Sequence, residues 1–145
     1  MRTMHILLVD DNAADTELTS EVLACICCES RIHAVTDGVE ALAFLHRDGK
    51  YASAVLPDFV ILDLNLPKKD GRAVLAEIKT DPDLRKVPVA VFSTSEERQD
   101  ILCSYELGAN CYLSKPGNLR DYVSSVKSIA DFWLGFARLP FEKRL

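Results

Sequence analysis

Acidic residues stand directly after two short apolar runs of this sequence. Asp10 and Asp11 follow residues 6–9, and Asp63 follows residues 59–62. Carboxylates that converge on one point repel each other, and a hard divalent cation such as Mg²⁺, which prefers carboxylate, carbonyl and water oxygens, removes that repulsion. Capping of the following helix is the alternative role for Asp10 or Asp11, but it gives Asp63 no role. The joint pattern therefore predicts a magnesium site that contains all three aspartates.

Two further polar residues also follow apolar runs, and their chemistry suits phosphoryl transfer. Ser93 follows residues 89–92, and Lys115 comes just after residues 111–113. A carboxylate such as Asp63 can act as a nucleophile and accept a phosphoryl group, provided that a metal and a cation neutralise the incoming oxygens. Lys115 is the candidate cation, and the Ser93 hydroxyl can hydrogen-bond a phosphoryl oxygen. The alternatives are a solvent-exposed lysine and a serine that caps a helix.

Other phosphate-binding arrangements do not fit the sequence. The first apolar run is followed by Asp10-Asp11-Asn12-Ala13 rather than by a glycine-rich loop, which excludes a P-loop or dinucleotide site. An aspartate-based phosphohydrolase, the enzyme-class alternative, needs a second acid near its nucleophile, but Asn65 stands two positions after Asp63 and cannot donate a proton as an acid does. We therefore expect no enzyme, but a phosphoacceptor that holds a phosphoryl group rather than turning over an external substrate.

Short apolar runs alternate with helical patterns along the chain, which is typical of βα units that form one parallel sheet. The predicted strands are residues 5–9, 31–35, 58–62, 88–92 and 110–114. The predicted helices cover about residues 13–28, 38–47, 71–80, 97–107 and a stretch that begins at 119. Parallel strands share a carboxyl-terminal edge, where open α/β sheets bind their ligands. The sheet is therefore expected to bring the candidate residues together.

The composition fits one globular domain, because 145 residues of which 48% are hydrophobic can enclose a single core. We expect residues 1–145 to form one domain, with a core at about 4–126 and a C-terminal helical extension and tail at 127–145. A net charge of −5 argues against direct DNA binding, and nothing after residue 126 is long or basic enough for a DNA-binding domain. The sequence has no apolar stretch of about 18–20 residues and no signal-peptide core. The expected location is thus the cytoplasm, without membrane contact.

Five cysteines do not make the regular framework of a small secreted fold. Cys25, Cys27 and Cys28 crowd one predicted helix. A zinc site there would need further ligands, and the histidines lie at no suitable spacing. We expect these cysteines to be small packing residues.

The set Asp10-Asp11, Asp63, Ser93 and Lys115, in this order and at this spacing, resembles the receiver domain of two-component response regulators. The resemblance covers about residues 4–126. It implies an α/β, flavodoxin-like fold, in which a five-stranded parallel sheet has the strand order 2-1-3-4-5 and helices on both faces. It also implies that a sensor histidine kinase phosphorylates Asp63 in a Mg²⁺-dependent step, and that the domain assists its own phosphorylation and dephosphorylation.

The resemblance assigns a role to each candidate residue. The metal would be bound by Asp10, Asp11, Asp63 and the backbone carbonyl of Asn65. The phosphoryl group would be contacted by Ser93 and Lys115.

The resemblance also predicts a conformational switch. Tyr112 would be the switch aromatic, and it would occupy space that Ser93 frees when the phosphoryl group draws the serine inward. The surface that changes would be the fourth helix, the fifth strand and the fifth helix. By the same analogy, the peptide bond between Lys115 and Pro116 is expected to be cis.

Within the family, residues 63–72 and 104–112 are similar to single-domain regulators that pair with bacterial phytochromes. The extra residues 51–56 and the tail Phe132-Trp133-Leu134 fit the same subgroup, so the expected kinase is a bacteriophytochrome. A pseudo-receiver adaptor that signals without phosphate is the binding-module alternative. The intact acidic set, the Ser93 hydroxyl and Lys115 disfavour it.

Phe132 and Phe136 lie off the inward side of the last predicted helix and are expected to be exposed. Exposed aromatic residues often mark a protein–protein interface. The alternative is a C-terminal tail that folds back, so that both pack under Leu139-Pro140-Phe141. We expect a homodimer through the C-terminal helix region.

Overall fold

Five parallel strands form one sheet at the centre of the structure, which is a computed structural model that describes residues 3–26 and 29–140. The strands are β1 Met4–Val9, β2 Ser30–Val35, β3 Phe59–Leu62, β4 Val89–Ser93 and β5 Cys111–Ser114. Their order in the sheet is β2-β1-β3-β4-β5, and every pair of neighbours is parallel. The predicted fold class and strand order are therefore confirmed.

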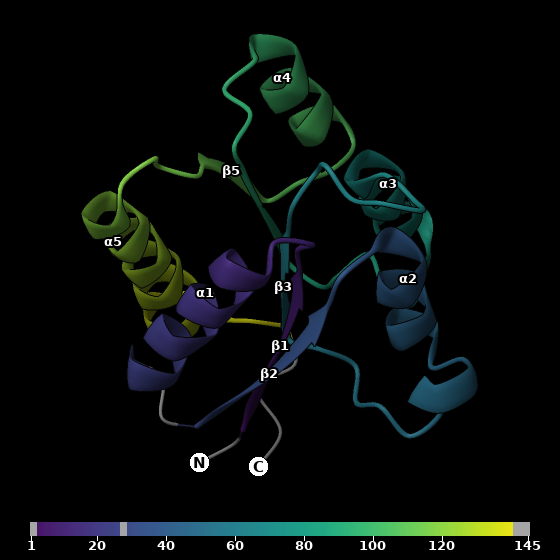
Figure 1. Cartoon of the computed structure of the whole chain (residues 1–145). Coiled ribbons are helices and arrows are strands. Elements are labelled where there is room, and N and C mark those ends of the chain that lie inside the picture. Colours follow the sequence, from purple (N-terminus) through teal and green to yellow (C-terminus); the bar gives the residue numbers. More distant parts are fainter. Residues whose placement is uncertain (1–2, 27–28, 141–145) are drawn as a thin grey trace.

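Helices cover both faces of the sheet (Figure 1). They are α1 Ala13–Ile26, α2 Gly38–His46, α3 Gly71–Thr80, α4 Arg98–Glu106 and α5 Leu119–Ala130. α1 and α5 lie side by side on one face, and α2 and α3 lie on the other. A 3-10 turn at Gly49–Tyr51 follows α2, and α5 continues into a π-helical segment at Asp131–Phe136. Across residues 3–26 and 29–140, no helix has the length and apolarity that a membrane crossing requires.

The predicted boundaries of these elements agree closely with the structure. Each predicted strand end, and each predicted helix end within the described residues, lies within one residue of the observed position. The end of the first helix is different, because its predicted last residue, Cys28, lies outside the described residues.

Alternating residues of the buried strands face two separate cores. In β1, Ile6 and Leu8 belong to the core beneath α1 and α5, whereas Leu7 and Val9 belong to the core beneath α2 and α3. All four side chains are at most 2% exposed. Successive side chains of a strand point to opposite faces, so an unbroken apolar run indicates a strand that is covered on both sides. This burial explains why such runs identified the strands.

Cys25 is exposed, so the expectation that it packs in the core is wrong. Thr19 and Leu23 are the buried residues of α1, and Cys25 follows two positions after Leu23, about 200° further round the helix. Its side chain therefore lies on the side that faces away from the sheet. Cys27 and Cys28 lie outside the described residues.

The residues that directly follow β1, β3 and β5 still take part in the backbone hydrogen bonding of the sheet. The Asp10 amide donates to the Val35 carbonyl (3.1 Å), and the Asp63 amide donates to the Val9 carbonyl (2.9 Å). The Lys115 amide donates to the Ser93 carbonyl at 2.6 Å. Each of these three residues thus continues the ladder with a neighbouring strand, which fixes where its side chain begins.

Gly71 packs against the backbone that follows Asp63. Its amide donates to the Leu64 carbonyl at 2.8 Å. A Cβ atom built on Gly71 would lie 2.3 Å from the Asp63 carbonyl oxygen and 2.6 Å from the Leu64 Cα atom. Both are backbone atoms, which cannot give way without displacing Asp63. Only glycine fits at this position.

We expect Gly71→Ala to lower the free energy of unfolding by about 1–3 kcal/mol, the usual cost of overpacking a close contact. The matched control is Gly117→Ala, because a Cβ atom there would meet nothing within 4 Å. The control should change the free energy of unfolding by less than about 0.5 kcal/mol. Urea denaturation measures both effects, and equal stabilities of the two variants would contradict the tight packing at Gly71.

Candidate functional site

The Lys115 ammonium joins side chains from three separate parts of the chain at the carboxyl-terminal edge of the sheet. It donates hydrogen bonds to Asp10 at 2.7 Å, Asp63 at 3.0 Å and Asp15 at 3.0 Å. The Lys115 side chain is 3% exposed, and those of Asp10 and Asp63 are 5% and 10% exposed. Lysine is almost never buried to this degree unless it is paired. The alternative of a solvent-exposed lysine is therefore wrong.

Three aspartates, Asp10, Asp11 and Asp63, form the group that can hold a metal ion. One carboxylate oxygen from each lies within 4.8 Å of the others, and no other such group of His, Cys, Asp or Glu occurs among the described residues. Asp10 and Asp63 are buried and Asp11 is exposed, so the group borders solvent on one side. An all-carboxylate set with room for water and phosphate oxygens fits a hard divalent cation such as Mg²⁺ or Mn²⁺.

Burial and charge shift the pKa values in this cluster. Burial raises the pKa of Asp10 above its usual value, although the hydrogen bonds from Lys115 and from the Asn12 amide lower it. Burial acts to lower the pKa of Lys115, but the hydrogen bond to Asp10 and the charges of Asp63 and Asp10 raise it above its usual value. Lys115 is therefore protonated at physiological pH and supplies a permanent positive charge.

Ser93 is the last residue of β4, which pairs with β3, the strand that Asp63 follows. β3 and β4 pair Leu62 with Val91, so the two strands reach the same edge together. Ser93 is 0% exposed, and its hydroxyl accepts a hydrogen bond from the Ser95 amide at 3.3 Å. It does not cap α4, because the N-cap residue of that helix is Glu97. The alternative role of Ser93 as a helix cap is thus wrong.

A chain of polar contacts connects the loop after β4 to its surroundings. The Tyr112 hydroxyl donates to the Ser95 carbonyl at 2.8 Å, and the Ser95 hydroxyl donates to the Asp100 carboxylate at 2.6 Å. The Arg72 guanidinium donates to the other oxygen of the same carboxylate at 2.6 Å. These bonds link β5, the loop, α4 and α3 in one network. Tyr112 is therefore hydrogen-bonded to Ser95, which lies two positions after Ser93.

Two other expectations concern the backbone. Asn65 is exposed, and its amide donates to the Asp63 carboxylate at 3.4 Å. No peptide bond among the described residues is cis, so the expectation for Lys115 and Pro116 is wrong. The two isomers of a bond before proline differ by only about 0.5–1 kcal/mol, and the sequence of the pair alone does not decide between them.

Sequence reasoning missed two parts of the site. Asp15, which contacts Lys115, is an acidic residue in the first turn of α1, a common place for aspartate in any helix, so local spacing did not mark it. The ion pair between Arg72 and Asp100 joins residues that are 28 positions apart. No local pattern marks that pair.

Comparison with known proteins gives the family. Residues 6–127 match the response regulator receiver domain. The chain is 48% identical to the response regulator Rcp1 from Synechocystis sp. over 135 residues, which cover 93% of this chain and 92% of Rcp1.

Solved structures agree with this match. The phosphorylated cyanobacterial phytochrome response regulator RcpA is 51% identical with a TM-score of 0.93, and the match covers 95% of this chain and 99% of RcpA. The Mn²⁺-bound form of Rcp1 is 47% identical with a TM-score of 0.92, and the match covers 94% of this chain and 99% of Rcp1. The fold, the acidic edge and these matches together place the chain in the response regulator receiver domain family.

Proposed function

We propose that this protein accepts a phosphoryl group on Asp63 from a sensor histidine kinase. The observation that carries the proposal is the convergence of Asp10, Asp11, Asp63 and Lys115 in one partly buried site. In the transfer, the bond between phosphorus and the histidine nitrogen of the kinase breaks, and a bond between phosphorus and an Asp63 oxygen forms. The histidine leaves as a neutral imidazole after taking up one proton.

Each residue of the site has a role in this proposal. Mg²⁺, when bound, neutralises charge on the phosphoryl oxygens. Its ligands would be Asp10, Asp11, Asp63 and the Asn65 backbone carbonyl. The Lys115 ammonium and the Ser93 hydroxyl would each donate a hydrogen bond to a phosphoryl oxygen, because both belong to the same edge of the sheet.

The relatives support a phytochrome as the kinase and a single receiver domain as the working unit. RcpA is a phytochrome response regulator and is similar over 99% of its chain. The match to Rcp1 covers 92% of that protein, which leaves little of Rcp1 for an output domain. We therefore propose that this chain also signals through the surface of its receiver domain.

Asp63→Asn should abolish labelling by radioactive acetyl phosphate in the presence of Mg²⁺, because the amide is no nucleophile for phosphorus. Removal of Mg²⁺ with a chelator should abolish labelling of the wild-type protein. Asp37→Asn is the matched control, since Asp37 is also buried and asparagine can replace it as the N-cap of α2. Undiminished labelling of Asp63→Asn would end the proposal.

The same purified wild-type protein distinguishes the proposed phosphoacceptor from the phosphohydrolase and pseudo-receiver alternatives. Steady turnover of a small phosphomonoester would support a phosphohydrolase, whereas a phosphoacceptor should incorporate at most one phosphoryl group per chain. A wild-type protein that takes up no label from acetyl phosphate or from a phytochrome kinase would support the pseudo-receiver.

We further propose that phosphorylation changes the surface formed by α4, β5 and α5. The phosphoryl group would draw the Ser93 hydroxyl toward it, and Ser95 would follow because it is two residues away and bonded to that hydroxyl. Tyr112 would then settle further inward, since its hydroxyl holds the Ser95 carbonyl. The Ser95 contact to Asp100 would carry the change to α4. A local change at the strand end would thus bias a two-state surface.

Tyr112→Phe tests this coupling, because it removes the hydroxyl and keeps the ring. Beryllofluoride, a mimic of the phosphoryl group, should still bind, but the amide NMR shifts that it causes in α4 and β5 should shrink. Loss of one hydrogen bond is worth about 1 kcal/mol, which shifts a two-state population about fivefold. The control is Tyr51→Phe, because the Tyr51 hydroxyl bonds Glu40 rather than Ser95. Wild-type shifts in Tyr112→Phe would refute the coupling.

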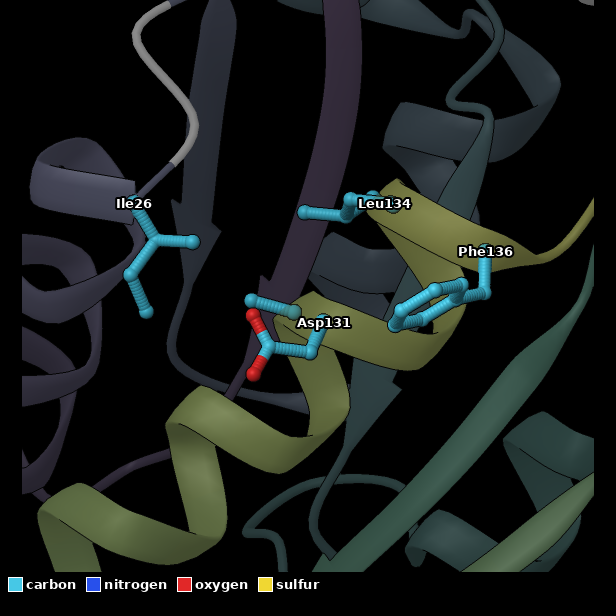
Figure 2. A pocket seen from close by; sticks show the side chains of 6 residues that line it. Ile26, Asp131, Leu134 and Phe136 are labelled. Carbon is cyan, nitrogen blue, oxygen red and sulfur yellow. The ribbon is translucent and has the colours of Figure 1, made fainter.

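We also propose a homodimer through the C-terminal helix region. Phe132 and Phe136 are 54% and 82% exposed, as the sequence predicted. Figure 2 shows a pocket with Ile26 and Phe136 at opposite sides and Asp131 and Leu134 between them. One surface therefore carries both a protruding aromatic ring and an apolar recess, which is what a two-fold symmetric interface needs. A second copy of the chain is the occupant that we propose.

Sedimentation velocity at tens of micromolar should show a dimer for the wild-type protein and a monomer for Phe136→Ser. The physical reason is that an aromatic side chain at an interface centre often contributes 2 kcal/mol or more, roughly a thirtyfold change in affinity. Leu119→Ser is the control, because Leu119 is 66% exposed at the opposite end of α5. A monomeric wild-type protein, with or without beryllofluoride, would remove this proposal.

A further inference from the structure

Asp15 is bonded to Lys115 but lies outside the group of aspartates that can hold a metal ion. A lysine ammonium has three N–H donors and no acceptor. In this structure Asp10, Asp15 and Asp63 accept from it at 2.7, 3.0 and 3.0 Å. The three carboxylates thus match the three donors, so a phosphoryl oxygen that binds Lys115 must replace one of them.

The fold holds the Asp15 backbone in place from two sides. Its amide donates to the Asn12 side-chain carbonyl at 2.9 Å, at the start of α1. Its carbonyl accepts from the hydroxyl of Tyr122, a buried residue of α5, at 3.4 Å. The same Tyr122 hydroxyl bonds the Thr19 hydroxyl at 2.7 Å. Asp15, in the first turn of α1, is therefore held against α5, and its side chain reaches Lys115 from there.

Of the three acceptors, Asp15 is the one that Lys115 can release at the lowest cost. The Asp15 side chain is 26% exposed, compared with 5% for Asp10 and 10% for Asp63. Water can take the place of Lys115 at Asp15, whereas it reaches the other two carboxylates poorly, so these depend on the cations of the site, Lys115 and a bound Mg²⁺. A phosphoryl group on Asp63 would therefore take the donor that Asp15 holds.

We propose that Asp15 is a positioning residue that holds Lys115 in the unphosphorylated protein and competes with the phosphoryl group for one lysine donor. This inference rests on the proposed phosphorylation of Asp63. In both states Asp15 adds a negative charge beside Asp10 and Asp63, and that charge opposes the arrival of phosphoryl oxygens. Asp15 thus favours the unphosphorylated state, and its neutralisation should favour the phosphorylated one.

Beryllofluoride binding tests the proposal without interference from hydrolysis. Its affinity would be measured by NMR titration at saturating Mg²⁺ for the wild type and the Asp15→Asn and Asp15→Glu variants. Asp15→Asn should bind about fivefold more tightly, because a partly exposed ion pair is worth up to roughly that factor. Asp15→Glu keeps a carboxylate that can reach Lys115, so the beryllofluoride affinity of this variant should lie within about twofold of the wild type. The amide spectra report whether each variant is folded.

Glu17→Gln is the matched control, because Glu17 is an exposed acidic residue of the same helix. It should change the affinity by less than about twofold, since solvent screens its charge. Unchanged or weaker binding by Asp15→Asn, an equal gain in Glu17→Gln, or a gain that persists in Asp15→Glu would overturn the role of Asp15. A wild-type protein that binds no beryllofluoride would instead overturn the proposed function, so the two failures are distinguishable.

Discussion

The structure depends on one electrostatic constraint, namely that neighbouring buried carboxylates need a positive charge between them. The side chains of Asp10 and Asp63 are 5% and 10% exposed, and the Lys115 ammonium bonds both. Removing one partner of a buried ion pair typically costs about 3–5 kcal/mol, because the remaining charge is left uncompensated. The three residues must therefore meet whenever the chain folds, although each comes from a different part of the sequence. A fold that buried Asp10 and Asp63 away from Lys115 would leave both carboxylates without this positive charge.

The strand order satisfies this constraint. Lys115 follows β5 at one edge of the sheet, whereas Asp63 and Asp10 follow β3 and β1, so the lysine must reach across β4. A long side chain can do this only if the strand in between ends in a small residue, and β4 ends in Ser93. Ser93 thus ends the strand that lies between Lys115 and the strand before Asp63. The same arrangement that pairs the charges brings a hydroxyl to the reaction centre.

The sequence predicted the parts of the site that follow from burial on both faces of the sheet. Unbroken apolar runs mark such strands, and the polar residue after each run, such as Asp63, must then lie at the common edge. Side chains on helices were harder to place, because their direction depends on how each helix is rotated against the sheet. That rotation is set by packing of residues such as Leu23, and it turns Asp15 toward Lys115 and Cys25 toward solvent. Neither outcome follows from local spacing alone.

α4 is the helix that the core holds least, and this supports its part in the proposed switch. Ser104 is its one buried residue among those described, whereas α3 buries Val74 and Ile78 completely. Elements that move in signalling come from the less stable part of a fold. α4 is attached instead by polar bonds at Asp100, which accepts from Ser95. Such bonds can exchange partners at a net cost of about 1 kcal/mol each, but a close-packed apolar face resists displacement. In the proposed switch, a small shift of Ser95 would therefore move α4 without disturbing the core that holds the acidic site.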